Sequence, residues 1–95
     1  MQFMITAYDG ADPEALERRL RVREDHLTGA KQLEESGQFI AGGAILDDHG
    51  KMIGSTLYMD FESRDKLNEW LHSDPYVVNG VWLDIKVDPI KLAFR

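Results

Sequence analysis

Residues 13–36 read PEALERRLRVREDHLTGAKQLEES, the longest segment of the chain with a helical pattern. Asp12 is a good N-cap, Pro13 suits the first helical position, and Gly37 is a stop signal directly after the segment. At about 100° per residue, three leucines of this segment share one stripe. They are Leu16, Leu20 and Leu27. The sequence therefore predicts one long amphipathic helix from Pro13 to Ser36.

Two polar residues interrupt the apolar side of this helix. Arg23 projects into the leucine stripe, and His26 lies on its flank about one turn further on. Burial of an unpaired charge costs several kcal/mol, so the pattern predicts either a polar cavity or a buried ion pair here. The remaining arginines scatter around the helix axis, close to glutamates, and are expected on solvated faces. They are Arg18, Arg19 and Arg21.

The 95-residue chain is long enough for one domain, which we expect to span residues 1–95. Its net charge of −6 disfavours binding to nucleic acid or to an anionic membrane, because both need clustered cations. The chain has no cysteine, which excludes disulfides and thiol chemistry. The first apolar stretch, Phe3 to Tyr8, is too short for a signal peptide or a membrane span, so we expect a cytoplasmic protein.

Four segments with strand patterns and a second helical segment complete the chain. The strands are expected at residues 2–8, 38–46, 52–61 and 81–87, the last with Val81, Leu83, Ile85 and Val87 inward. Ser63 caps the second helix, and Asp74-Pro75 ends it, because a residue before proline avoids the helical region. The order βαββαβ predicts an α+β ferredoxin-like fold, with two helices on one face of a four-stranded antiparallel sheet.

The first three strands carry apolar residues on both faces, although the helices of this fold cover only one face. Met4 and Tyr8, for example, alternate with Phe3 and Ile5. A second copy of the chain, packed sheet to sheet, is the economical way to cover the other face. We therefore expect a homodimer, in which the tail from Ile90 to Phe94 is placed to reach the partner.

Asp74, at the end of the second helix, is the carboxylate best placed to pair with Arg23 or His26. A carboxylate at a helix C-terminus meets the negative end of the dipole and gains from a cationic or hydrogen-bonding neighbour. Two interpretations remain open. Asp74 orients His26 as a general base, or it forms a buried structural ion pair with Arg23.

Other polar side chains add less specific signals. Tyr76 can supply a phenolic donor or an aromatic wall, and Ser55 can supply a hydroxyl that has no activating base on its own strand. His49 and His72 have no second ligand at metal-binding spacing, so no metal site is expected.

Four short motifs follow one another along nearly the whole chain: VREDHL at residues 22–27, GQFIAGGA at 37–44, GST at 54–56 and DPY at 74–76. In this order and spacing they resemble the YciI-like (YCII-related) family. The resemblance implies a dimeric α+β barrel with a histidine and an aspartate as its catalytic centre, here His26 and Asp74. It also implies that Arg23, Ser55 and Tyr76 surround this centre and bind the substrate.

These observations predict a homodimeric, cytoplasmic enzyme that needs no cofactor and acts as a lyase or an isomerase. His26 is the general base or acid, Asp74 orients it, and Arg23 binds an anionic oxygen of a small oxygenated cyclic metabolite. The reaction class is proton abstraction, elimination or isomerisation. The alternative hypothesis is a non-catalytic homodimer that binds a small ligand in the same cleft, or that serves another enzyme as an accessory module.

Overall fold

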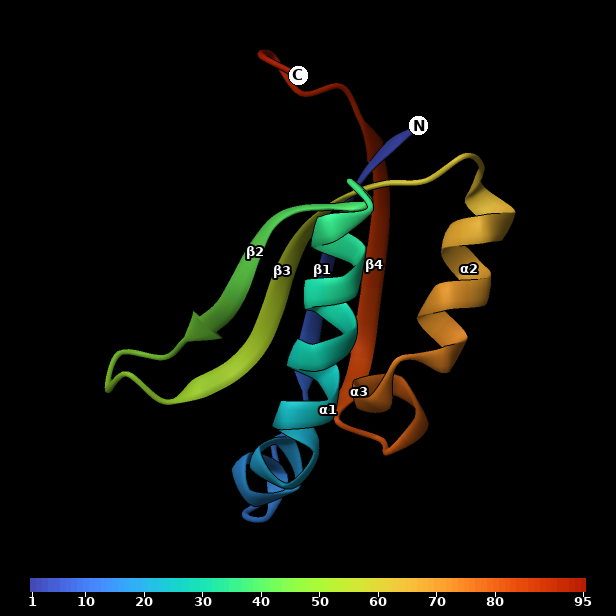
Figure 1. Cartoon of the computed structure of the whole chain (residues 1–95). Helices are drawn as coiled ribbons and strands as arrows, with labels where there is room; N and C mark the ends of the chain where they lie inside the picture. The colour runs from blue at the N-terminus through green and yellow to red at the C-terminus, as the bar shows by residue number, and fades with distance from the viewer.

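The computed structural model describes all 95 residues, Met1 to Arg95. Its elements are β1 (Gln2–Asp9), α1 (Ala15–Glu35), β2 (Phe39–Leu46), β3 (Met52–Asp60), α2 (Arg64–Ser73), α3 (Pro75–Val78) and β4 (Trp82–Ile90). The strands form one antiparallel sheet in the order β2-β3-β1-β4. In Figure 1, α1 and α3 lie in front of this sheet, α2 lies beside its edge strand β4, and no helix lies behind it. The predicted ferredoxin-like α+β fold is therefore confirmed.

The face of the sheet that meets the helices carries the core. Alternation along β1 places Phe3, Ile5 and Ala7 on this face, and all three are buried. On the neighbouring strand β3, Leu57 lies opposite Ile5 and Ser55 lies opposite Ala7. Two polar side chains interrupt this apolar side of the sheet, namely the buried hydroxyl of Ser55 and the buried carboxylate of Asp9 at the end of β1.

Helix α1 begins later than the sequence pattern predicts. Its first residue is Ala15, and the N-cap is Glu14, which makes no side-chain capping bond. The Asp12 carboxylate instead accepts a hydrogen bond of 2.6 Å from Arg18, so the predicted cap at Asp12 and start at Pro13 are wrong. The end of the helix agrees with the prediction, since Gly37 follows the C-cap residue Ser36 and adopts a positive φ of 84°.

The buried side of α1 also differs from the predicted leucine stripe. Leu20 is 51% exposed and Leu27 is 45% exposed, and Arg23 between them is exposed as well. The residues that face the sheet and α3 are spaced at intervals of three and four. They are Ala15, Arg19, Val22 and His26. The helix presents this side because its two polar members, Arg19 and His26, find carboxylate partners on other elements.

Strand β4 departs from strict alternation at its start. The β1–β4 register shifts between Tyr8 and Asp9, and this bulge brings Trp82 opposite Asp9. Trp82 is buried, whereas Leu83 is 66% exposed, so the prediction that Leu83 faces inward is wrong. Leu83 is the extra residue of this bulge, so Trp82 lies on the opposite face of the sheet from the one that strict alternation predicts.

The segment after α2 is a sharp corner that positions the site. Ser63 caps α2 by accepting a hydrogen bond of 3.2 Å from the Lys66 amide, as predicted. Asp74 ends α2 in an extended conformation and at the same time caps the four-residue helix α3, accepting the Tyr76 amide at 3.0 Å. Helix α3 lies between α1 and α2, beside the start of β4 (Figure 1). None of the helices is long and apolar enough to cross a membrane.

Candidate active site

His26 and Asp74 form a buried pair between α1 and α3. The Nδ1 atom of His26 lies 2.8 Å and 3.0 Å from the two carboxylate oxygens of Asp74, and His26 is only 6% exposed. An ionised carboxylate accepts hydrogen bonds but donates none, so Nδ1 carries the proton. In the neutral ring, Nε2 is then the nitrogen without a proton, and the neutral ring is the state that a general base needs.

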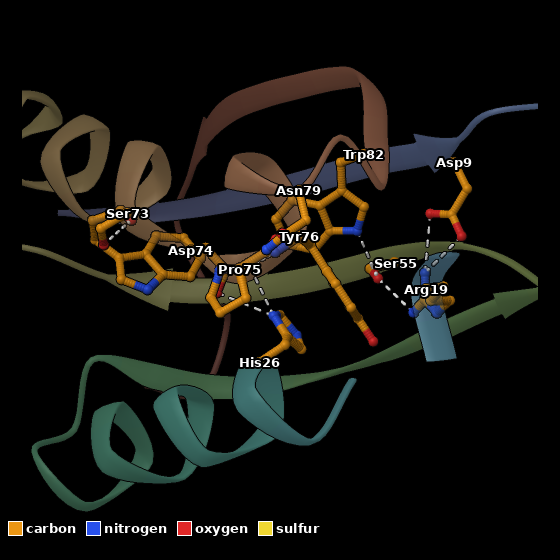
Figure 2. Close-up of polar contacts among 11 residues, drawn as sticks. Asp9, Arg19, His26, Ser55, Ser73, Asp74, Pro75, Tyr76, Asn79 and Trp82 are labelled. Atoms are coloured by element: carbon orange, nitrogen blue, oxygen red, sulfur yellow. Dashed lines mark hydrogen bonds and ion pairs between the residues drawn. The ribbon is translucent and has the colours of Figure 1, made fainter. Parts of the chain in front are cut away.

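Aromatic rings fix the plane of the imidazole. The Tyr76 ring stacks on His26 with a centroid distance of 4.0 Å and an angle of 13° between the planes. Trp82 meets His26 edge-on at 5.5 Å and Tyr76 at 5.4 Å. Figure 2 shows the three rings packed side by side, with the Tyr76 phenol extending past His26 toward Arg19. The imidazole is therefore held by one hydrogen-bond partner and two ring contacts, and it has little rotational freedom.

A second buried ion pair, Arg19–Asp9, lies on the far side of Tyr76 from His26 (Figure 2). Arg19 is 3% exposed and its Nη1 contacts both carboxylate oxygens of Asp9, at 3.0 Å and 3.1 Å. Its Nη2 donates to the Ser55 hydroxyl at 2.8 Å, and Trp82 Nε1 donates to the same hydroxyl at 3.1 Å. The Arg19 guanidinium carbon is 4.8 Å from the centroid of the Tyr76 ring, which is cation–π distance.

Burial shifts two acids of this cluster. Desolvation raises the pKa of Asp9 above its ordinary value of 3.8, and the Arg19 guanidinium opposes this shift without cancelling it. Desolvation also raises the pKa of Tyr76 above 10.0, against the smaller effects of Arg19 and Arg23. The phenol is therefore protonated at neutral pH and can donate a hydrogen bond to a ligand.

The site opens into a cavity of about 110 Å³ between α1 and the sheet, next to strand β2. Residues around His26, residues around Arg19 and part of strand β2 line this cavity. The lining includes Arg19, Arg23, His26, Gly42, Ser55 and Tyr76. Gly42 is required there because a Cβ atom on it would lie 2.7 Å from the Thr56 carbonyl oxygen. The cavity thus joins a candidate base, two cations and two hydroxyls.

The structure brings together four of the five predicted site residues as buried neighbours and places the fifth at the edge. His26, Asp74, Ser55 and Tyr76 are buried, whereas Arg23 lines the cavity from an exposed position. The hypothesis of a buried Arg23–Asp74 pair is wrong, because Asp74 binds His26. No group of three His, Asp or Glu residues is arranged to hold a metal ion.

Sequence reasoning missed three residues of the site, namely Asp9, Arg19 and Trp82. Arg19 was expected in solvent, yet it lies four residues after the buried Ala15 and seven before His26, on the same side of α1. This spacing was the available signal. Asp9 and Trp82 are brought to Arg19 and Ser55 only by the pairing of β1 with β4, which the sequence pattern does not reveal in detail.

The fold and the site define a class of small ferredoxin-like α+β proteins that carry a buried His–Asp pair beside a cavity. Comparison with known proteins places the chain more closely, since residues 1–91 match the model of the YCII-related domain. The chain belongs to this family. An uncharacterized protein of Haemophilus influenzae is 38% identical over 100 residues, covering 99% of this chain and 100% of that protein. Protein YciI of Escherichia coli is 36% identical, with the same coverage.

Among solved structures, the chain is similar to 5-chloro-2-hydroxyhydroquinone dehydrochlorinase (TftG) from Burkholderia phenoliruptrix, in complex with 2,5-dihydroxybenzoquinone. The TM-score is 0.83 and the sequence identity 28%, with 96% of this chain and 94% of that chain covered.

Proposed function

We propose that the protein is an enzyme that uses His26 as a general base, oriented by Asp74, in proton abstraction, elimination or isomerisation on a small oxygenated cyclic metabolite. One observation carries this proposal. His26 Nδ1 contacts the Asp74 carboxylate at 2.8 Å in a buried position, and His26 also lines the cavity. The contact occupies Nδ1 and leaves Nε2 as the basic nitrogen. Such chemistry needs a positioned base and a stabilised anion, and it needs no cofactor.

The charges of the cavity favour an anionic ligand or intermediate. Asp9 neutralises Arg19, and Asp74 pairs with His26, so Arg23 is the cavity cation that has no ion-pair partner within the chain. An exposed, unpaired guanidinium at the edge of a small cavity can bind an anionic oxygen in bidentate fashion. We assign this role to Arg23.

The size of the cavity supports a substrate with a single ring. Its volume of about 110 Å³ is of the same order as the roughly 150 Å³ engineered cavity that takes up one benzene molecule. The complex of TftG with 2,5-dihydroxybenzoquinone supports the same class, since that ligand is one oxygenated ring. We therefore propose hydroxylated quinones and related cyclic carbonyl compounds as candidate substrates, in a lyase or isomerase reaction.

We further propose that the protein acts in the cytoplasm as a homodimer. The face of the sheet opposite the helices carries Met4, Tyr8 and Tyr58, and no helix of the chain covers it (Figure 1). A 95-residue domain leaves a large fraction of its surface exposed, and a second copy packed on this face would bury these side chains.

The test is turnover of a panel of hydroxylated quinones, hydroquinones and related cyclic carbonyl compounds by the wild type, by His26→Ala and by His72→Ala. 5-Chloro-2-hydroxyhydroquinone belongs in this panel, and chloride release reports its conversion. His72 is an exposed histidine of α2 and serves as the matched control. We expect His26→Ala to lose activity by about 10²-fold or more, while His72→Ala keeps it. Full activity of His26→Ala would overturn the proposal, and binding without turnover in the wild type would favour the non-catalytic ligand-binding or accessory module.

A further inference from the structure

The Ser55 hydroxyl accepts two hydrogen bonds within the chain and donates none. Its Oγ accepts from Arg19 Nη2 at 2.8 Å and from Trp82 Nε1 at 3.1 Å. A hydroxyl oxygen has two lone pairs and one hydrogen, so these two bonds use its full capacity as an acceptor. No acceptor within the chain receives the Ser55 hydrogen, although the residue is 2% exposed and lines the cavity. The hydroxyl is therefore built to donate to something that enters the cavity.

The residue that holds Ser55 shows a second unmet hydrogen bond. Arg19 Nε is buried and has no acceptor, although Nη1 and Nη2 are both engaged. A buried charged donor without a partner is costly, and native structures keep such groups where a function requires them. The positive guanidinium also draws electron density from the Ser55 oxygen and makes its hydrogen a stronger donor.

We propose that Ser55 is the hydrogen-bond donor for the substrate oxygen on which negative charge develops, and that Arg19, Asp9 and Trp82 are its positioning residues. This inference rests on the proposed function, because it assigns the second half of the same reaction. Ser55 and His26 line the same cavity and lie near opposite sides of Tyr76 (Figure 2). A base on one side and an oxygen-binding donor on the other fit an enolisable cyclic carbonyl compound.

The step balances without an oxidant or a reductant. In a cyclic carbonyl compound that has a saturated carbon next to the carbonyl, the C–H bond on that carbon breaks, and its proton passes to His26 Nε2. The electron pair of that bond forms the new C=C bond, while the carbonyl π pair moves onto oxygen, where the Ser55 hydroxyl donates to it. Preorganised donors of this kind stabilise an enolate because they need no reorientation as the charge appears.

The first experiment measures stabilisation of a ring oxyanion without any turnover. The probe is 4-nitrophenol, whose phenolate absorbs visible light, so that absorption titration gives the pKa of the bound phenol. We expect the wild type to lower this pKa relative to free 4-nitrophenol. Ser55→Ala should weaken the preference for the phenolate by about tenfold or more, because a hydrogen bond to a charged oxygen is lost. Thr56→Ala is the matched control, since Thr56 is the adjacent residue on the opposite face of the sheet and should leave the bound pKa unchanged.

A second variant covers the case in which Ser55→Ala does not fold. Asp9→Asn keeps a hydrogen-bonding group beside Arg19 and removes the neutralising charge, so it should lower the pKa of bound 4-nitrophenol further than the wild type does. A purely structural Asp9–Arg19 pair would change stability and leave the pKa of the probe alone.

The outcomes separate this inference from the proposed function. An equal bound pKa in the wild type and in both variants overturns the role of Ser55, even if His26→Ala abolishes turnover. Failure of the wild type to bind 4-nitrophenol at millimolar concentration overturns it as well. A Ser55-dependent shift in a protein without turnover supports the oxygen site and removes only the acid–base proposal.

Discussion

Arg19 and His26 lie about two turns apart on α1 and hold the ring of Tyr76 between them, each bound to a carboxylate from another element. Asp9 comes from the end of β1, and Asp74 comes from the corner between α2 and α3. One helix face thus carries a buried Arg–Asp ion pair and a buried His–Asp hydrogen bond, with the Tyr76 ring between them. The His26 ring lies 4.0 Å from the centroid of this ring, and the Arg19 guanidinium carbon lies 4.8 Å from it.

The Asp74 carboxylate sets the tautomer of His26, which Asp74→Asn tests. Asparagine remains a good N-cap for α3, so the fold should survive. Its amide can donate to Nδ1 and move the ring proton to Nε2, which removes the base. We expect turnover to fall by about 10²- to 10⁴-fold, by analogy with the serine protease triad. Nitrogen-15 NMR of the His26 ring should show the exchanged tautomer, and an unchanged tautomer would contradict this mechanism.

Arg23 should contribute to ligand affinity and little to stability. It is exposed and has no ion-pair partner within the chain, so Arg23→Ala removes no internal contact of that kind. We expect the dissociation constant of an anionic ring such as 2,5-dihydroxybenzoquinone to rise about tenfold, with an unchanged melting temperature. Arg21→Ala, which removes an exposed arginine outside the cavity, is the control for calorimetric titration. An equal loss of affinity in both variants would mean that only general electrostatic attraction is at work.

The raised pKa of Asp9 predicts a pH dependence with an unusual sign. Because the folded pKa lies above 3.8, the stabilisation from Asp9 is present below 3.8 and is lost as pH rises through the folded value. Asp9→Asn does not titrate at this position. Urea unfolding from pH 3 to pH 7 should therefore show the wild type losing stability relative to Asp9→Asn as pH rises. A gap that moves in favour of the wild type would show that the ionised pair stabilises the fold.

Tyr76 should limit stability at alkaline pH. Burial raises its folded pKa above 10.0, so the stabilisation it provides is present below 10.0 and is lost as pH rises through the folded pKa. Tyr76→Phe removes this titration and keeps the ring that stacks on His26. The difference between the ultraviolet titrations of the two proteins isolates Tyr76, and its midpoint should lie above 10.0. A midpoint below that value would contradict the burial of the phenol.

The proposed homodimer predicts that a charge on the uncovered sheet face prevents association. Met4 lies opposite Tyr58 on β3 and Asp88 on β4, near the middle of the width of the sheet. We expect the wild type to sediment as a dimer and Met4→Glu to sediment as a folded monomer, because association would bury a second carboxylate beside Asp88 without a cationic partner. Lys86→Met, which removes a charge from the same face, should remain dimeric. A monomeric wild type at micromolar concentration would remove the dimer from the proposal.

The sequence predicts those parts of the fold that depend on neighbouring residues. The cap at Ser63, the corner at Asp74-Pro75 and the stop at Gly37 are each set by local backbone chemistry, and each is found as predicted. The pairing of His26 with Asp74 was one of two interpretations that the residue pattern left open, and only the resemblance to the YCII-related family favoured it over an Arg23–Asp74 pair. The spacing of the leucines along α1, in contrast, predicted that Leu20 and Leu27 are buried, and this prediction was wrong.

The errors at Arg19 and Trp82 share one physical cause, which is that partners distant in the sequence decided whether these side chains are buried. Arg19 is buried because Asp9 and Ser55 come to it from two strands, and no local pattern reports that encounter. Trp82 faces inward because a bulge against Asp9 changes the phase of β4. Propensity and periodicity describe single elements, whereas this half of the site is made by the pairing of elements.

Asp74 ends one helix, begins the next and holds the imidazole, all with a single side chain. Because Asp74 has these three roles, its substitution is expected to disturb the structure more than substitution of His26 does. His26 can be replaced without dismantling a helix boundary, whereas most replacements of Asp74 also loosen the corner that carries Tyr76. The architecture of the chain therefore depends more on the aspartate of this pair than on the histidine.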